Sequence, residues 1–188
     1  MGVDLFYFIS SLPTLGLDGQ CPLTATQFLQ QCRELLGDDI AGRLENIRLV
    51  PDNTAPVDDT VAQWYSFETY LRNTLSELRR SRLKLPPQDT GRQSKEQFYL
   101  YRKQIEEAMA LTSTVARENK LDAMRFAYLG ELESAHYFNL PLLELYLLKL
   151  LIIDKRSGRK LPEGRATFDR MLEAGFAQAG EKRIGDEL

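Results

Sequence analysis

Glu68 and Arg72 are the residues whose types and spacing come nearest to a reacting pair in this sequence. They lie four residues apart in WYSFETYLRNTLSELRRSRLKL, a stretch whose apolar residues recur with helical spacing. On a helix from about residue 60 to residue 85, both side chains lie beside the apolar stripe rather than opposite it. An acid–base reaction would need a second acid, a pocket and a nucleophile, and the sequence locates none of them. We therefore interpret them as an ion pair at the edge of a packed helix, with partner contact as the alternative and catalysis ranked last.

A metal site is the second kind of chemistry that the sequence suggests. Glu133 and His136 have the Glu-x-x-His spacing of ferritin-like di-iron sites. Such a site needs a second motif of this kind, and His136 is the only histidine in the chain. The same count excludes a zinc site built from several histidines of one chain. We therefore expect no metal and no cofactor, and interpret Glu133 and His136 as surface or interhelix residues.

The two cysteines, Cys21 and Cys32, do not form a C-x-x-C motif, and we expect both to be reduced thiols. Cys32 lies on the apolar stripe of a predicted helix with Phe28 and Leu35, which favours a buried and unreactive thiol. A pairing of Cys32 with His136 remains open. The sequence contains no glycine-rich phosphate-binding loop and no G-x-S-x-G motif. We therefore expect a protein that is not an enzyme, with catalysis by carboxylates alone as an open alternative.

The charge of the chain argues against nucleic acid as a partner. The 188 residues carry a net charge of −3, so the chain lacks the broad positive field that nucleic-acid binding needs. Two local basic clusters, RRSRLK at residues 79–84 and KRSGRK at residues 155–160, each close or follow a predicted helix. Basic residues there complement the helix dipole. A docking patch for an acidic protein surface is the alternative.

Capping signals and helical periodicity predict an all-α protein. Thr24 and Gln27 form a capping-box pattern, and Gly37 is placed to end the helix that they open. Ser94 and Gln97 repeat the pattern before a helix that continues towards residue 120. Strand signals are weak, although the first residues could form a short strand or a helical turn. We predict an irregular bundle of about six to seven helices, with the further helices at about 38–50, 60–85, 121–138, 140–153 and 165–178.

The most apolar segment, Leu140–Ile153, has 14 residues and contains Glu144 and Lys149. A membrane span needs roughly 20 apolar residues, so we predict a buried or partner-facing helix and no direct membrane span. At least one of the two charged side chains should then contact another segment of the chain. We also expect one helical domain at residues 1–176 and a polar tail at residues 177–188. The start of the sequence has no basic region of the signal-peptide type, so we expect a cytoplasmic protein.

Three stretches, in the same order, resemble a family of uncharacterised proteins encoded beside bacterial V/A-type ATPase genes. They are LFYFISSLPTL, YSFETYLRNTLSELRRSRL and FNLPLLELYLLKLLIIDKRSGRKLPEGRATFDRML. In that family an aromatic run precedes Ser-Leu-Pro, and a Phe-Glu-x-x-Leu-Arg-Asn block and a leucine-rich helix follow. The matching positions here are Phe67, Glu68, Leu71, Arg72 and Asn73 for the block, then Lys149 and Leu150, and then Gly164 and Phe168.

The resemblance implies a stand-in for the all-helical connecting subunit of the rotary ATPase. That subunit lies between the central stalk and the membrane rotor ring, and it couples torque by docking rather than by catalysis. The expected partners are therefore V/A-type ATPase subunits, with the protein peripheral at the inner membrane through the ATPase. The alternative is an unrelated helical interaction module, for example a homodimer formed through the helix at 140–153. The candidate structural or partner-contact residues are Phe67, Glu68, Leu71, Arg72, Asn73, Glu144, Lys149 and Arg156.

Overall fold

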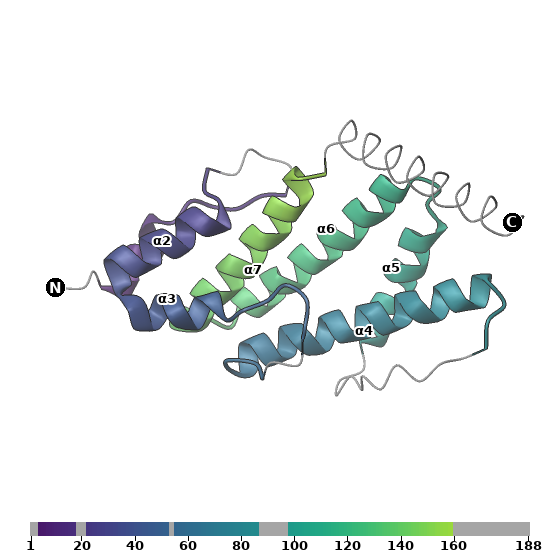
Figure 1. The fold of residues 1–188 in the computed structure, drawn as a ribbon, viewed down its shortest axis with the longest axis horizontal. Coiled ribbons are helices and arrows are strands. Elements are labelled where there is room, and N and C mark those ends of the chain that lie inside the picture. The colour runs from purple at the N-terminus through teal and green to yellow at the C-terminus, as the bar shows by residue number, and fades with distance from the viewer. Residues whose placement is uncertain (1–3, 18–21, 53–54, 87–97, 160–188) are drawn as a thin grey trace, which may run out of the picture. The chain divides into compact units, whose positions relative to one another are not determined.

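Helices are the only regular secondary structure in the computed structural model, which describes residues 4–17, 22–52, 55–86 and 98–159. This part of the chain forms seven helices and no strand (Figure 1), which confirms the predicted all-α bundle. Of the two alternatives for the first residues, a short strand or a helical turn, the helical one is confirmed, because Leu5–Ser11 is an α-helix. In chain order the helices are α1 (Leu5–Ser11), α2 (Ala25–Leu36), α3 (Asp38–Glu45), α4 (Asp59–Arg82), α5 (Tyr99–Ala110), α6 (Thr114–Glu133) and α7 (Leu140–Ser157).

The chain divides into two units, Met1–Asp154 and Lys155–Leu188, and α7 crosses the boundary between them. All of the packing described below belongs to the first unit. The helix expected at 165–178 and the expected domain boundary after residue 176 both lie outside the described residues.

The predicted capping box at the start of α2 is confirmed. The backbone N–H of Gln27 donates to Thr24 Oγ1 at 3.2 Å, and the backbone N–H of Thr24 donates to Gln27 Oε1 at 2.9 Å. Gly37 follows with φ +99°, a left-handed conformation that separates α2 from α3 and that side chains with a Cβ rarely adopt. Local sequence therefore sets both ends of α2. The second capping-box pattern, at Ser94 and Gln97, lies outside the described residues.

The boundary between α5 and α6 differs from the sequence prediction. We expected one helix to continue towards residue 120, but α5 ends at Ala110 and Leu111 is extended. Ser113 then caps α6, because its hydroxyl accepts the backbone N–H of Ala116 at 3.3 Å. The serine and threonine residues that were expected inside one helix instead mark the start of the next, since their hydroxyls compete with the helical hydrogen bonds.

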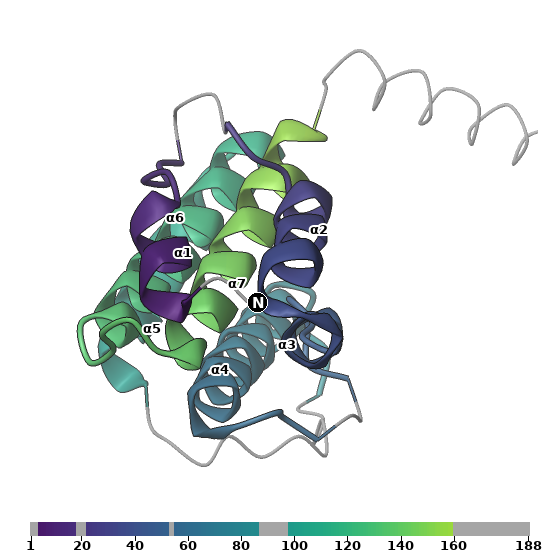
Figure 2. The same ribbon diagram turned by 90° about the vertical axis from the view of Figure 1, so that its left-hand side faces the viewer.

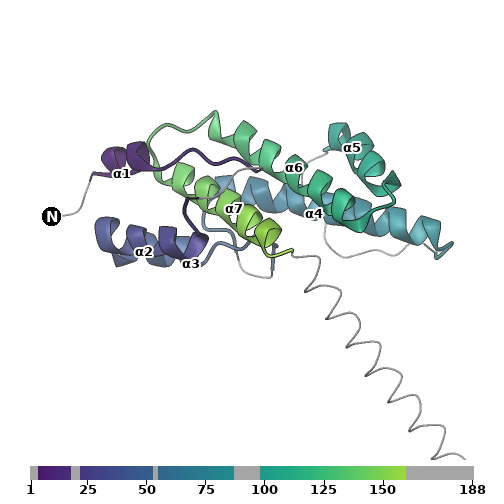
Figure 3. The same cartoon turned by 90° about the horizontal axis from the view of Figure 1, so that it is seen from above.

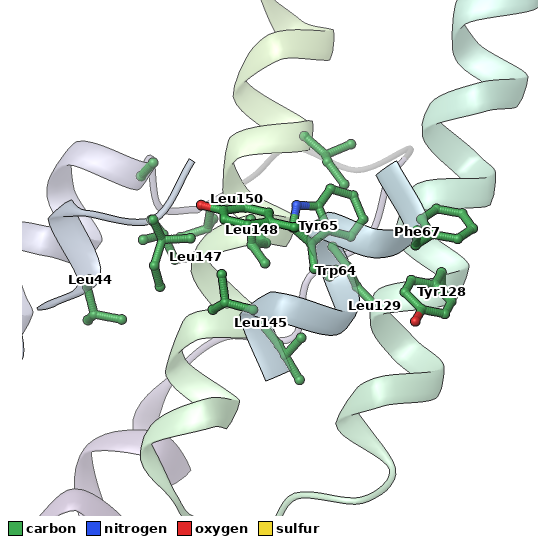
Figure 4. Close-up of a cluster of buried hydrophobic side chains, with 14 of the residues drawn as sticks. Leu44, Trp64, Tyr65, Phe67, Tyr128, Leu129, Leu145, Leu147, Leu148 and Leu150 are labelled. Atoms are coloured by element: carbon green, nitrogen blue, oxygen red, sulfur yellow. The ribbon is translucent and has the colours of Figure 1, made fainter. Parts of the chain in front are cut away.

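The core forms around α7, the apolar helix that the sequence predicted to be buried or partner-facing. Figures 2 and 3 show α7 between α1 on one side and α2 on the other. Figure 4 shows side chains from α3, α4, α6 and α7 meeting in one cluster, and Trp64 is completely buried within it. The residues labelled there are Leu44, Trp64, Tyr65, Phe67, Tyr128, Leu129, Leu145, Leu147, Leu148 and Leu150. The chain itself therefore covers most of α7.

None of the described helices combines the length and the apolar character that crossing a bilayer requires.

Candidate functional site

Glu68 belongs to a buried charge cluster that joins α4 to α6. Its side chain is only 1% exposed, and its Oε1 accepts hydrogen bonds from Arg72 Nε at 2.8 Å and Arg125 Nη2 at 3.0 Å. Its Oε2 accepts from Arg125 Nε at 2.8 Å. Arg125 also donates to Asp122 Oδ1 at 2.9 Å, within the same helix. The predicted pair of Glu68 and Arg72 therefore exists, but Arg125 is the more buried partner of the carboxylate.

The geometry of this cluster favours a structural role. Both oxygens of Glu68 already accept hydrogen bonds from arginine side chains, so the carboxylate is held in place between α4 and α6. Sequence reasoning missed Arg125 and Asp122. The available signal was their spacing of three residues on the same face of α6 as Leu121 and Leu129, both fully buried.

The rest of the Phe-Glu-x-x-Leu-Arg-Asn block also lies in or beside the core. Phe67 stacks on Tyr128 of α6 with ring centroids 4.1 Å apart and an interplanar angle of 15°. Leu71 is fully buried, whereas Arg72 and Asn73 are half-buried. Three of the candidate residues therefore pack against other parts of the same chain: Phe67, Glu68 and Leu71.

Glu144 and Lys149 both contact other segments of the chain, as predicted. Glu144 is completely buried, and its Oε1 accepts from Arg43 Nε of α3 at 2.8 Å. Lys149 donates to Glu133 of α6, and its ammonium lies 4.9 Å from the centroid of the Phe126 ring. Burial and the carboxyl group of Asp58 raise the pKa of Glu144 and Arg43 opposes them, which leaves the pKa at about 7. The candidate Arg156 lies in the last turn of α7, in the second unit.

The remaining polar candidates are separated rather than gathered at one site. His136 Nε2 lies 3.2 Å from Thr60 Oγ1, and Nδ1 lies 3.2 Å from Asn139 Nδ2, while Glu133 binds Lys149. Among the residues that the structure describes, no three histidine, cysteine, aspartate or glutamate side chains are placed to share a metal ion. Cys32 is a buried free thiol, and burial raises its pKa to about 12. Cys21 lies outside the described residues.

Two arginines of the first basic cluster bind backbone carbonyl groups, one in the last turn of α5 and one in the segment after α4. Arg82 Nη2 donates to the carbonyl oxygen of Met109 in the last turn of α5 at 2.6 Å. Arg80 Nε donates to the carbonyl oxygen of Pro86 at 2.8 Å. These contacts agree with the interpretation of the cluster as helix-end stabilisation. In the second cluster, Lys160 lies outside the described residues.

A cavity of about 240 Å³ lies between α1, the end of α6 and the first half of α7. Its charged lining residues are Glu133 and Lys149, which pair with each other. None of Glu68, Arg72 and Glu144 lines this cavity. The full lining is Ile9, Leu12, Pro13, Thr14, Leu15, Glu133, Leu142, Leu143, Tyr146 and Lys149.

Four exposed aromatic residues, Phe6, Tyr7, Tyr137 and Phe138, form what we call the aromatic surface. The ring centroids of Phe6 and Phe138 are 4.4 Å apart, and those of Phe6 and Tyr7 are 5.5 Å apart. Tyr137 is 78% exposed and Tyr7 is 66% exposed. Figure 3 shows α1 beside the connection between α6 and α7, and this places the Phe6 ring against the Phe138 ring, next to Tyr137 in the sequence.

The backbone of Phe138 is held in an uncommon conformation beside this surface. Its φ is +50°, a value that is rare for a bulky residue. The connection between α6 and α7 thus presents an aromatic ring at the surface from a strained position.

Comparisons with models of protein families, with curated proteins and with solved structures give no match. The family resemblance therefore depends on the three sequence stretches described above, two of which meet at the aromatic surface.

Proposed function

We propose that the protein is a non-catalytic helical subunit or accessory protein of a V/A-type rotary ATPase, and that it docks through the aromatic surface. The observation that carries this proposal is the contact between Phe6 and Phe138. These residues come from the first and last of the three stretches that resemble the ATPase-associated family, and both side chains are nearly half exposed. The stretches are thus linked by an exposed contact as well as by the core.

Exposed aromatic rings of this kind suit a protein interface. Tyrosine and phenylalanine side chains provide large contact areas with few rotatable bonds, and aromatic residues are enriched at the centres of interfaces. Phe138 adds a backbone conformation that costs of the order of 1–2 kcal/mol. Within the chain, burial of the side chain offsets little of this strain, because Phe138 stays 45% exposed. A partner that covers the ring would recover the missing burial.

The cavity beside α1 extends this surface. Ile9 lines the cavity and lies one helical turn after Phe6, while Leu142 lines it from the first turns of α7. A cavity of about 150 Å³ is known to hold benzene, so 240 Å³ is enough for one large apolar side chain of a partner. We propose that the partner places such a side chain here while it covers the aromatic rings.

In the assembled enzyme this surface would face a component of the central stalk or of the rotor ring, with the protein peripheral to the inner membrane. The proposal is tested by recovering the tagged protein from its native host after gentle detergent solubilisation. The wild-type protein should bring down rotary ATPase subunits. Recovery of none of them, from preparations in which the ATPase is intact, would contradict the proposal.

A matched pair of variants tests the docking surface itself. The double substitution Tyr7→Ser and Tyr137→Ser removes two exposed rings, so it should reduce recovery of ATPase subunits by more than about tenfold. Tyr99→Ser is the control, because Tyr99 is 70% exposed and lies outside the aromatic surface. Equal recovery with the double variant and the control would place the docking surface elsewhere.

A homodimer remains the second candidate function, because the aromatic surface would also serve self-association. The helix at 140–153 is an unsuitable interface, since most of its apolar side chains are buried against the chain itself. Light scattering distinguishes the two functions. A dimer that the Tyr7→Ser and Tyr137→Ser double variant converts to a monomer, together with no recovery of ATPase subunits, would favour the homodimer.

A further inference from the structure

Asp58 and Glu144 share one guanidinium group at the junction of α3, α4 and α7. Arg43 Nε donates to Glu144 Oε1 at 2.8 Å, and Arg43 Nη2 donates to Asp58 Oδ2 at 2.8 Å. Asp58 is also the N-cap of α4, where its Oδ1 accepts the backbone N–H of Val61 at 3.0 Å. Two carboxylates against one cation would leave one negative charge without compensation at a site where Glu144 is fully buried.

The uncompensated negative charge concerns the second carboxylate oxygen of Glu144. Oε2 is buried and accepts no hydrogen bond from any described residue. The carboxyl groups of Glu144 and Asp58 are nevertheless held side by side, because each binds the guanidinium group of Arg43 at 2.8 Å. Two ionised carboxylates only accept hydrogen bonds, so they cannot bond to each other. A proton on Glu144 Oε2 turns that oxygen into a donor, and it then has Asp58 as its acceptor.

We infer that Asp58 and Glu144 hold one proton between them in the folded protein, and that this proton latches the junction of α3, α4 and α7. With the proton in place, the junction has one positive and one negative charge, and each carboxyl group has a partner. When the proton is lost, Glu144 carries a buried charge beside Asp58, and the contacts among the three elements weaken. The site therefore binds a proton as its ligand and makes the junction sensitive to pH.

The electrostatic environment agrees with the latch. Burial raises the pKa of Glu144 to about 7, and the nearby carboxyl group of Asp58 acts in the same direction. Burial would also raise the pKa of Asp58, but hydrogen bonds from Glu144 and from Val61 and the charge of Arg43 lower it overall. The two carboxyl groups thus titrate far apart, as expected for a pair that shares one proton.

Other charged groups meet α7 at different places. Tyr146 contacts the Pro13 carbonyl oxygen and the Phe28 ring of α2, Asp154 accepts the backbone N–H of Ala25, and Lys149 pairs with Glu133 of α6. His136 is a further titratable group near the latch, because it contacts Thr60, two residues after Asp58. A test must therefore separate Glu144 from His136.

The sign of the pH effect follows from the raised pKa of Glu144. Between the ordinary value of 4.5 and about 7, the folded protein binds more protons than the unfolded chain, so stability falls as pH rises. Below 4.5 both states are protonated, and the stabilisation is fully present. Between pH 5 and pH 7 this one group should lower the folding equilibrium constant by about 40-fold.

The test measures urea unfolding of the wild-type protein and of three variants from pH 5 to pH 8. Glu144→Gln should abolish most of the slope, because its amide donates to Asp58, accepts from Arg43 and cannot lose a proton in this range. Glu77→Gln should keep the wild-type slope, since the hydrogen bond from Arg102 lowers the pKa of Glu77 and places its titration below the range. His136→Gln should also keep the slope.

A direct titration covers the case in which Glu144→Gln does not fold. The carboxyl ¹³C resonance of Glu144 in the wild-type protein should shift with a midpoint near pH 7. A midpoint near 4.5 would overturn the latch. A slope that survives Glu144→Gln, or one that disappears with His136→Gln, would overturn it as well.

Discussion

Replacing Arg125 with methionine should destabilise the protein more than any other single change in the cluster around Glu68. Arg125 is 6% exposed by its side chain and makes three hydrogen bonds, two to Glu68 and one to Asp122. Methionine fills part of the space but leaves a buried carboxylate with much less compensation. Removing one partner of a buried ion pair typically costs about 3–5 kcal/mol in the free energy of unfolding. For a protein of this size, that loss lowers the melting temperature by about 6 to 20 °C.

Arg72→Met is the matched control, because Arg72 binds the same carboxylate from the other side. Its side chain is 40% exposed and makes one hydrogen bond to Glu68 at 2.8 Å. Solvent screens a pair of this kind, so the substitution should cost less than about 1 kcal/mol. Urea unfolding followed by circular dichroism measures both variants on the same scale.

A double-mutant cycle then isolates the contact between α4 and α6. Glu68→Gln removes the charge that Arg125 compensates, so the double variant with Arg125→Met should be clearly less destabilised than the sum of the two single variants. We expect a coupling energy of about 2 kcal/mol or more. Equal losses for Arg125→Met and Arg72→Met, or a coupling energy below about 0.5 kcal/mol, would refute the idea that burial makes Arg125 the dominant partner.

Three further predictions concern local features. Gly37→Ala should destabilise the protein by about 1–3 kcal/mol, because φ +99° strains any residue with a Cβ. Gly42→Ala in α3 should be neutral or stabilising, since its Cβ meets nothing within 4 Å, and urea unfolding shows whether the two effects differ in sign. Thr24→Ala should cost about 1 kcal/mol by removing the capping box of α2, and thermal unfolding would count against this if the melting temperature did not move. Cys32 should resist iodoacetamide at pH 8 in the folded protein and react after unfolding, because burial raises its pKa to about 12; mass spectrometry detects the label, and rapid labelling of the folded protein would contradict the buried position.

Features encoded over short distances in the chain were predictable. The capping box at Thr24, the turn at Gly37 and the buried helix at 140–153 each depend on residues within one helix or at its ends. The pair of Glu68 and Arg72 belongs to the same class, since it lies within α4. In these cases the spacing along the sequence also determines the spacing in the structure.

Features that join distant segments were not predictable from one sequence. Arg125 reaches Glu68 from 57 residues away, and Arg43 reaches Glu144 from 101 residues away. Nothing in the local pattern of either helix indicates which partner the other helix will present. The break between α5 and α6 was missed for a different reason. The Ser113 hydroxyl accepts a backbone N–H at the start of α6, and such local hydrogen bonds compete with the continuation of a helix.

The central position of α7 has a consequence for the order in which the protein can fold as it is synthesised. α2 and α3 pack together, as do α4, α5 and α6, so these two groups form from neighbouring parts of the chain. The groups meet around α7, which the ribosome makes after both of them. The first turn of α2 even depends on it, because the backbone N–H of Ala25 donates to Asp154 Oδ2 at 2.9 Å, 129 residues later. Until that residue emerges, the earlier helices expose apolar faces that α7 covers in the folded protein, and a chain that stops short of it should depend on chaperones.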